Sequence, residues 1–395
     1  MLVTDRAAWD AQTDWTTGRW RPRPAARVRA IWQPAPQPGE LPKRPLRLAE
    51  ILDSGFRLLR YSPGVSVGAA MITLTLLLLA FGALVAGIGW LTFGYLFSIS
   101  DSPDAAGGLT FLMQLGASII AFLSLCFLHF LSGMLAVPAY HAFFSRVGAQ
   151  PRDSRGRKTT TLRATWQQLA GRRRRLIGAT ALLGTAHLVA LLVLVMPGVL
   201  IALFAGLAVV GSVLAVIGVL LWFVFTVFFM VRTAFVGCAI TAEGLTIRQA
   251  FARSWELTGR RFWATAGTLL LTYVLSSQLI SIIISPVMIV FFIVVLVVAL
   301  TIGSGDEYEQ FAYIAFAVLT ILGVSLTSAA TAVFYAYMSG VITGLYFDRR
   351  MRFDGYDLVL LREAEERGAA EAGAASGAQP APEAGAADGD RSAAA

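Results

Sequence analysis

The sequence predicts an all-α membrane protein, a polytopic helical bundle of about six transmembrane helices in three units of an amphipathic helix plus a hairpin. Of its 395 residues, 56% are hydrophobic and only 14% are charged, against about 25% charged in an ordinary soluble domain. Uncharged tracts each exceed the about 20 residues that cross a bilayer core. These tracts are residues 65–100, 105–145, 176–231, 262–304 and 311–347.

The basic residues predict the orientation of the chain. All 32 Lys and Arg residues fall in the four segments 1–64, 146–175, 232–261 and 348–395. The breaks at 101–104 and 305–310 carry acidic residues and no basic ones. Because basic loops stay in the cytoplasm, we expect a multi-pass protein of the cell membrane with both termini inside.

Six crossings satisfy this distribution. They are expected at about 66–97, 109–145, 176–196, 199–231, 262–301 and 311–346. Several are longer than one straight crossing needs, and proline removes a backbone donor, so we expect breaks at Pro138, Pro197 and Pro286. An alternative with eight crossings splits the last two tracts and leaves the basic loops on the same side.

An amphipathic segment precedes each pair of crossings. In Thr246–Leu257, the residues Ile247, Phe251 and Trp255 share one helical face, and Thr246 with Gln249 can form a capping box. Similar segments occur twice more. We therefore expect interfacial helices near 46–60, 161–171 and 246–257, within a membrane domain that spans 46–362.

The two ends of the chain have a different composition. Residues 1–45 are rich in Arg, Pro and Trp and predict a disordered cytoplasmic arm; the alternative is an arm held on anionic lipid. A helix is expected over 358–367, and 363–395 reads as a disordered Ala/Gly/Glu-rich tail. No nucleic-acid partner is expected, since no folded reader is recognisable. Only Lys43 and Lys158 among 32 basic residues are lysine, which suits a GC-rich bacterial genome.

We expect neither a catalytic residue, a cofactor nor a metal. No Asp or Glu lies in any predicted span, and Cys126 and Cys238 have no CxxC partner, so both should be buried free thiols. His129, His187 and Gln278 are candidates for an intramembrane polar site, because ionisable groups are costly at membrane depth. The alternative for a histidine is a hydrogen bond to a neighbouring helix. His129 and His141 lie about 18 Å apart along a helix, too far to share a metal.

Arginines near the predicted membrane boundary are the candidates for contact with anionic lipid headgroups, since guanidinium groups suit phosphate. Anchoring of basic loops in the cytoplasm would also place arginines there. The candidates are Arg57, Arg60, Arg172, Arg173, Arg174, Arg175, Arg260 and Arg261.

Hydroxyl residues gather in the last two tracts. They are Ser276, Ser277, Ser281 and Ser285 in the fifth crossing, and Ser325, Thr327, Ser328 and Thr331 in the sixth. Small polar residues at this density are typical of close helix packing. The alternative is a groove for a lipid or solute.

Three motifs, PLRLAEILDSGFRLLR, ITAEGLTIRQAFARSWELTGRRFW and GLYFDRRMRFDGYDLVLLR, resemble the glycerophosphoryl diester phosphodiesterase membrane-domain family. The resemblance covers most of 45–362. It implies a membrane fold without an activity, because the soluble barrel of the family's namesakes and its His-Arg-Gly motif are absent from this sequence.

The sequence therefore predicts a non-enzymatic integral membrane protein. We expect it to organise lipid, or a membrane protein partner, at the inner leaflet. The alternative is a transporter or channel for a small or lipid-like solute through the fifth and sixth crossings.

Overall fold

The computed structural model describes residues 13–14, 19–20, 40–76, 79, 126–145, 161–204, 207–301 and 309–377. The chain divides into two compact units, Met1–Pro38 and Gly39–Ala395. In the first unit, β1 (Thr13–Asp14) pairs antiparallel with β2 (Arg19–Trp20). Thr13 lies opposite Trp20, a β-branched and aromatic pair of the kind that stabilises strands. The predicted disordered arm thus contains a short hairpin.

The arm also ends earlier than predicted. Leu41 is buried, and its N–H donates to the carbonyl of Ala142 at 3.3 Å. The N–H of Glu40 bonds the carbonyl of Ser145 at 3.1 Å. Residues 40–45 therefore belong to the second unit, because Leu41 fills part of its core.

The second unit is an all-α helical bundle, which confirms the predicted fold class. Its helices are α2 (Leu48–Tyr61), α5 (Leu162–Gln168), α6 (Arg173–Phe204), α7 (Ala208–Thr233), α8 (Val236–Ala242), α9 (Ile247–Gly259), α10 (Phe262–Thr301), α11 (Glu309–Asp354) and α12 (Tyr356–Gly377). Two further apolar helices cover Pro63–Leu76 and Cys126–Ala142.

The described residues contain four helical stretches long and apolar enough to cross a membrane. They are Arg173–Ala202, Ala208–Ala242, Phe262–Ile282 and Ile314–Asp354. These coincide with the third to sixth predicted crossings, so the chain is a multi-pass membrane protein. The first predicted crossing lies largely outside the described residues, which include its start in the helix Pro63–Leu76. The second is described over its latter half, which contains the helix Cys126–Ala142.

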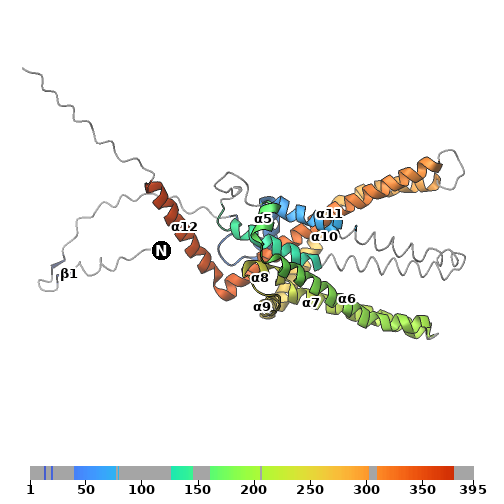
Figure 1. Cartoon of the computed structure of the whole chain (residues 1–395), viewed down its shortest axis with the longest axis horizontal. Helices are drawn as coiled ribbons and strands as arrows, with labels where there is room; N and C mark the ends of the chain where they lie inside the picture. Colours follow the sequence, from blue (N-terminus) through green and yellow to red (C-terminus); the bar gives the residue numbers. More distant parts are fainter. Residues whose placement is uncertain are drawn as a thin grey trace, which may run out of the picture. The chain divides into compact units, whose positions relative to one another are not determined.

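Helices α6 and α7 form an antiparallel hairpin whose turn lies later than predicted (Figure 1). At three levels a glycine of one helix lies against the backbone of the other: Gly198 against Ala215, Gly211 against Ala202, and Gly218 against Leu194. The midpoint of each pair along the chain falls at residue 206 or 207. Residues on both sides of Pro197 therefore pack against α7, and α6 continues past this proline. The predicted break at Pro197 is wrong, because a transmembrane helix packed against a neighbour tolerates a proline.

Helices α10 and α11 form a second hairpin (Figure 1). Pro286 lies inside α10, and Pro138 lies inside the helix Cys126–Ala142. The breaks predicted at these two prolines are therefore also absent. Since α10 and α11 are each one continuous helix, the structure does not contain the two splits that eight crossings require.

Helix α2 packs against α11 through residues without bulky side chains. A Cβ added at Gly340 would come within 2.9 Å of the Cα atom of Gly55, and one at Gly344 would overlap the hydroxyl of Ser54. Gly340 and Gly344 are four residues apart, so they lie on one face of α11 and let the two backbones approach closely.

Short helices lie at the start of each hairpin. Helices α2, α5 and α9 coincide with the three predicted interfacial segments, and the N–H of Thr246 bonds Gln249 Oε1 at 3.1 Å as the capping box requires. Helix α8 was not predicted, because the sequence places it at the end of an apolar tract. It is buried over 236–241 and packs on Cys126–Ala142, where a Cβ at Gly237 would overlap the carbonyl of His129.

The last helix, α12, begins at Tyr356 and continues to Gly377. It contains the helix predicted over 358–367 and continues it through 368–377, within the segment 363–395 that was predicted as a disordered tail. Alanine is the strongest helix former, and the segment is rich in it. Residues 378–395 lie outside the described part of the chain.

Candidate lipid-contact residues and intramembrane sites

Two charged residues near the end of α11, Asp348 and Arg352, bind the segment that precedes α2. Asp348 is buried, and its carboxylate accepts hydrogen bonds from Arg352 Nε at 2.9 and 3.0 Å. It also accepts the N–H of Leu46 at 2.8 Å, and Arg352 donates to the carbonyl of Leu46 at 2.6 Å. This carboxylate and guanidinium therefore bind both polar groups of one backbone position ahead of α2.

A second ionic cluster joins α8, α9 and α11. Glu243 lies 3.4 Å from Arg253 Nε and 3.5 Å from Arg350 Nε, and accepts the Tyr346 hydroxyl at 2.6 Å. Arg253 also pairs with Asp354. Burial opposes the charge of Arg253, but the three carboxylates around it, Glu243 foremost, raise its pKa above the ordinary value. The cluster is thus a structural network of paired charges.

The structure ties most of the predicted headgroup arginines to protein groups. Arg57 bonds Asp53 Oδ2 at 2.6 Å, and Arg260 bonds Glu256 Oε1 at 3.1 Å. In the four-arginine run, three guanidinium groups bond carbonyl oxygens: Arg172 bonds Thr241, Arg173 bonds Trp166, and Arg175 bonds Gly244. These arginines hold α6 against α5 and the end of α8.

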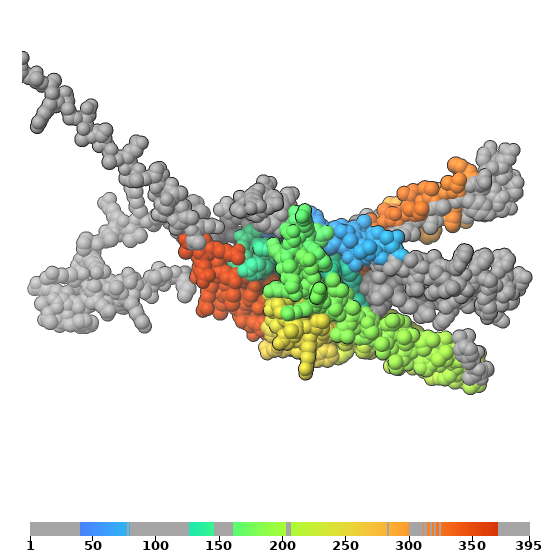
Figure 2. Space-filling view, in the orientation of Figure 1, coloured from blue at the N-terminus to red at the C-terminus, as the bar shows by residue number. Residues whose placement is uncertain are grey.

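Arg60, Arg174 and Arg261 differ from the rest. Each is exposed, and within the described residues none of their guanidinium groups has a hydrogen bond or an ion pair. Arg60 lies at the end of α2, Arg174 in the first turn of α6, and Arg261 directly before α10. Arg174 and Arg261 therefore stand at the base of the α6–α7 and α10–α11 hairpins, and Arg60 precedes the helix Pro63–Leu76, where the first hairpin is predicted to begin. Figure 2 shows the start of α6 in green beside α9 in yellow, which the contacts between them support.

Large aromatic side chains accompany these arginines. Trp255 is 45% exposed and Trp263 84% exposed, as expected of indole rings at a lipid–water boundary. Arg232 was not among the residues predicted from the sequence. Its guanidinium lies 4.8 Å from the ring centroid of Trp255, 5.1 Å from that of Phe262 and 5.4 Å from that of Phe228. This arginine joins the end of α7 to α9 and α10. Only its position beside an apolar tract could have pointed to it.

The histidines bond other helices or their own. His129 Nε2 lies 3.1 Å from Thr233 Oγ1 of α7, and His141 Nε2 lies 3.4 Å from Gln168 Oε1 of α5. His187 Nδ1 lies 2.9 Å from its own helix's Leu183 carbonyl. His129 and His141 thus match the alternative of a histidine bonded to a neighbouring helix.

The hydroxyl residues of α10 and α11 line a groove of about 510 Å³. Its polar lining consists of Tyr273, Ser277, Ser281, Ser285, Thr327, Thr331 and Tyr335. Some hydroxyl groups donate to carbonyls of their own helix, as Thr331 does to Thr327 at 2.7 Å. Gln278 does not line this groove and is exposed. The structure does not bring it near His129 or His187 in any shared cavity of the described residues.

A polar pocket of about 670 Å³ adjoins the second ionic cluster. Its polar side chains are Tyr140, His141, Gln168, Arg172, Glu243, Arg350, Tyr356 and Glu363. They bind across the pocket: the Tyr140 hydroxyl donates to Glu363 at 2.7 Å. Glu243 and Arg350 could not be predicted as site residues from the sequence, because their neighbours come from distant parts of the chain.

Comparison with known proteins adds no assignment: no family model, no curated protein and no solved structure matches this chain.

Proposed function

We propose that this chain is a non-enzymatic protein of the cell membrane that organises anionic lipid at the inner leaflet. One observation carries the proposal: exposed arginines without a protein partner in the described residues stand at the base of the α6–α7 and α10–α11 hairpins, at Arg174 and Arg261, and ahead of the first predicted hairpin, at Arg60. Both termini would then be cytoplasmic, and a membrane protein partner could use the same face.

Physical chemistry supports lipid as the counterpart of these arginines. A basic residue near an anionic membrane surface contributes about 1 kcal/mol of attraction. Other candidate arginines, such as Arg57 and Arg260, form ion pairs with carboxylates of the protein. The exposed rings of Trp255 and Trp263 would sit at the same depth and fix the level of the membrane boundary.

The resemblance to the glycerophosphoryl diester phosphodiesterase membrane-domain family stays a prediction and fits this proposal. The residues that form the two ionic clusters, including Asp348 and Glu243, come from the motifs that carry the resemblance. The motifs would therefore preserve a fold that presents arginines to lipid, without an associated reaction.

Lipid co-purification tests the proposal. The triple variant Arg60→Gln, Arg174→Gln and Arg261→Gln, solubilised from membranes, should retain less phosphatidylglycerol than the wild type, as measured by mass spectrometry. The control, Arg163→Gln with Arg248→Gln and Arg362→Gln, removes the same charge from exposed residues within α5, α9 and α12 that do not directly precede a membrane-spanning helix. Equal retention of phosphatidylglycerol by both variants would contradict the proposal.

The hydroxyl-lined groove between α10 and α11 favours a second candidate, passage of a lipid-like solute. Scrambling of fluorescent phosphatidylglycerol in proteoliposomes would measure it. If the groove is the path, Ser281→Phe should abolish the activity, whereas Gln278→Ala outside the groove should not. No scrambling by the wild type would rule out this candidate for that lipid.

A further inference from the structure

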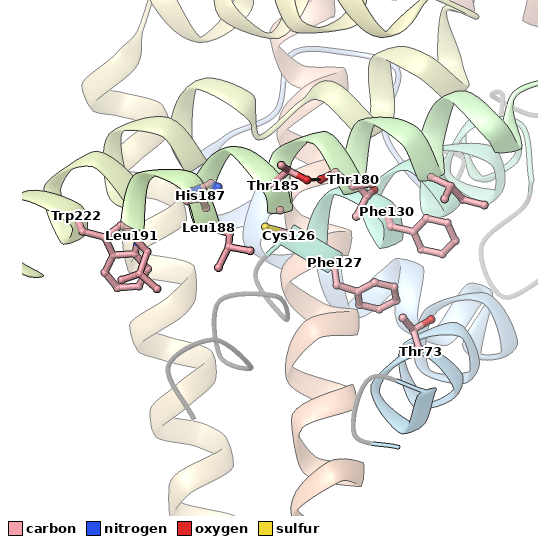
Figure 3. A pocket seen from close by; sticks show the side chains of 13 residues that line it. Thr73, Cys126, Phe127, Phe130, Thr180, Thr185, His187, Leu188, Leu191 and Trp222 are labelled. Atoms are coloured by element: carbon pink, nitrogen blue, oxygen red, sulfur yellow. Dashed lines mark hydrogen bonds between the residues drawn. The ribbon is translucent and has the colours of Figure 1, made fainter. Parts of the chain in front are cut away.

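A mainly apolar groove runs beside α6 within the membrane-spanning part of the chain (Figure 3). Its volume is about 500 Å³. One wall is α6; the opposite wall includes Thr73, Phe127 and Phe130. Trp222 of α7 lines it as well.

The α6 wall is a single helical stripe. It consists of Ile177, Thr180, Ala181, Gly184, Thr185, His187, Leu188 and Leu191. Most of these residues repeat at intervals of three or four, which places them on one face. Arg174 precedes Ile177 by three residues and therefore continues the same stripe at its N-terminal end.

The dimensions of the stripe suit a lipid chain. From Ile177 to Leu191 the helix rises roughly 21 Å at 1.5 Å per residue. One leaflet contributes about half of a hydrocarbon core of about 30 Å. The groove thus runs at least the depth of one leaflet and begins where α6 begins.

The N-terminal end of the groove is also its charged end. The Phe130 ring lies 6.5 Å from the Trp166 ring, which lies 4.8 Å from the guanidinium of Arg173. Arg174 is exposed beside this group, and a helical side chain leans toward the N-terminus of its helix. Its guanidinium therefore points away from the apolar lining, toward the depth at which headgroup phosphates lie.

We propose that this groove holds one acyl chain of an anionic phospholipid whose phosphate pairs with Arg174. The inference rests on the proposed function and makes it specific, because it assigns one hairpin base a bound lipid molecule. A phospholipid matches both ends of the stripe, an apolar chain along Ile177–Leu191 and an anion at Arg174. A second copy of the chain would place protein along the groove and would leave the charge without a counterpart.

Photo-crosslinking tests this site. The full chain would be reconstituted in vesicles of equal phosphatidylglycerol and phosphatidylethanolamine, with a trace of phosphatidylglycerol that carries a diazirine on one acyl chain. Mass spectrometry of peptides should locate cross-links within 177–191. Ala181→Trp puts a large ring on an exposed position of the groove wall and should reduce these cross-links at least about fivefold. Leu182→Trp, on an exposed residue outside the groove, should leave them unchanged.

The headgroup is tested with a matched probe, phosphatidylethanolamine with the same diazirine chain. In the wild type the phosphatidylglycerol probe should label the groove more strongly, and Arg174→Gln should lower that preference about fivefold. Equal effects of Ala181→Trp and Leu182→Trp, or no headgroup preference in the wild type, would overturn the assignment. If the triple arginine variant loses phosphatidylglycerol but Ala181→Trp leaves the cross-links in the groove unchanged, the groove assignment is refuted and the proposed function is not.

Discussion

The N–H of Leu46 donates to the carboxylate of Asp348 at 2.8 Å, although 302 residues separate the two positions. The contact joins the segment before the first hairpin to the end of the last long helix. Arg352 completes it from the other side by donating to the Leu46 carbonyl. The buried Asp348 carboxylate and the Arg352 guanidinium therefore link the start of the membrane domain to its end through the two peptide groups that flank Leu46.

Asp348→Asn should destabilise the folded protein. The substitution keeps the shape of the side chain but removes the charge that pairs with Arg352. Because the Asp348 carboxylate is buried while the Arg352 side chain is partly exposed, the expected cost is about 2 kcal/mol. The apparent melting temperature in detergent, followed by tryptophan fluorescence, should fall by several degrees. Asp357→Asn, on α12, should melt like the wild type, since Asp357 has no hydrogen bond or ion pair within the described residues.

The contact between α2 and α11 predicts that neither glycine of α11 tolerates a side chain. A Cβ at Gly340 would lie 2.9 Å from the Cα atom of Gly55, and one at Gly344 would lie 2.9 Å from the Cβ atom of Ser54. Neither atom can move by a rotamer change, so we expect Gly340→Ala and Gly344→Ala each to cost about 1–3 kcal/mol. Gly267→Ala, with open space around it, is the control. Thermal unfolding of either variant at the temperature of the control would contradict the packing.

Replacement of Arg232 by glutamine should loosen the junction of α7, α9 and α10. The change removes cation–π contacts to three rings and should cost roughly 1–2 kcal/mol. The emission of Trp255 should change as well, because its ring loses the adjacent cation. Arg261→Gln removes a nearby exposed charge without such contacts, so its thermal unfolding should equal that of the wild type.

Glu50 predicts an acid-dependent contribution to stability. Its carboxylate accepts the N–H of Arg47 at 2.8 Å, which is the main cause of its lowered pKa, and pairs with Arg44 at 2.6 Å. A lowered folded-state pKa means that this stability is present above the unfolded value and is lost as the pH falls. The melting temperature of the wild type should therefore exceed that of Glu50→Gln at about pH 6, and the two should converge toward about pH 3.

A gap of constant size between the two proteins over this range would contradict the assignment. Glu365→Gln serves as the control, since Glu365 is exposed on α12.

Composition and periodicity sufficed for the fold class and for much of the element order. The absence of charges over 176–231 and 262–304 predicted long apolar helices, and the stripe through Ile247, Phe251 and Trp255 predicted α9. These signals are local, because they depend on which residues neighbours in one helix must bury.

The contacts between helices could not be predicted from the sequence alone. Pro197 is a helix breaker in isolation, and only the glycine contacts of α6 with α7 explain why α6 continues past it. In the same way, Arg172 and Arg174 are neighbours in one arginine run. Their different roles depend on the Thr241 carbonyl, which α8 brings to Arg172 and not to Arg174.

The proposed function requires Arg60, Arg174 and Arg261 all to face the cytoplasmic leaflet. Arg60, Arg174 and Arg261 would each be replaced by cysteine, one at a time, in a protein whose own cysteines are removed by Cys126→Ala and Cys238→Ala. Cells that express each variant would be treated with a membrane-impermeant maleimide. In intact cells that express the protein, we predict no labelling at any of the three positions, and labelling at all three after permeabilisation. Labelling of any one of the three positions from outside intact cells would contradict the proposed function.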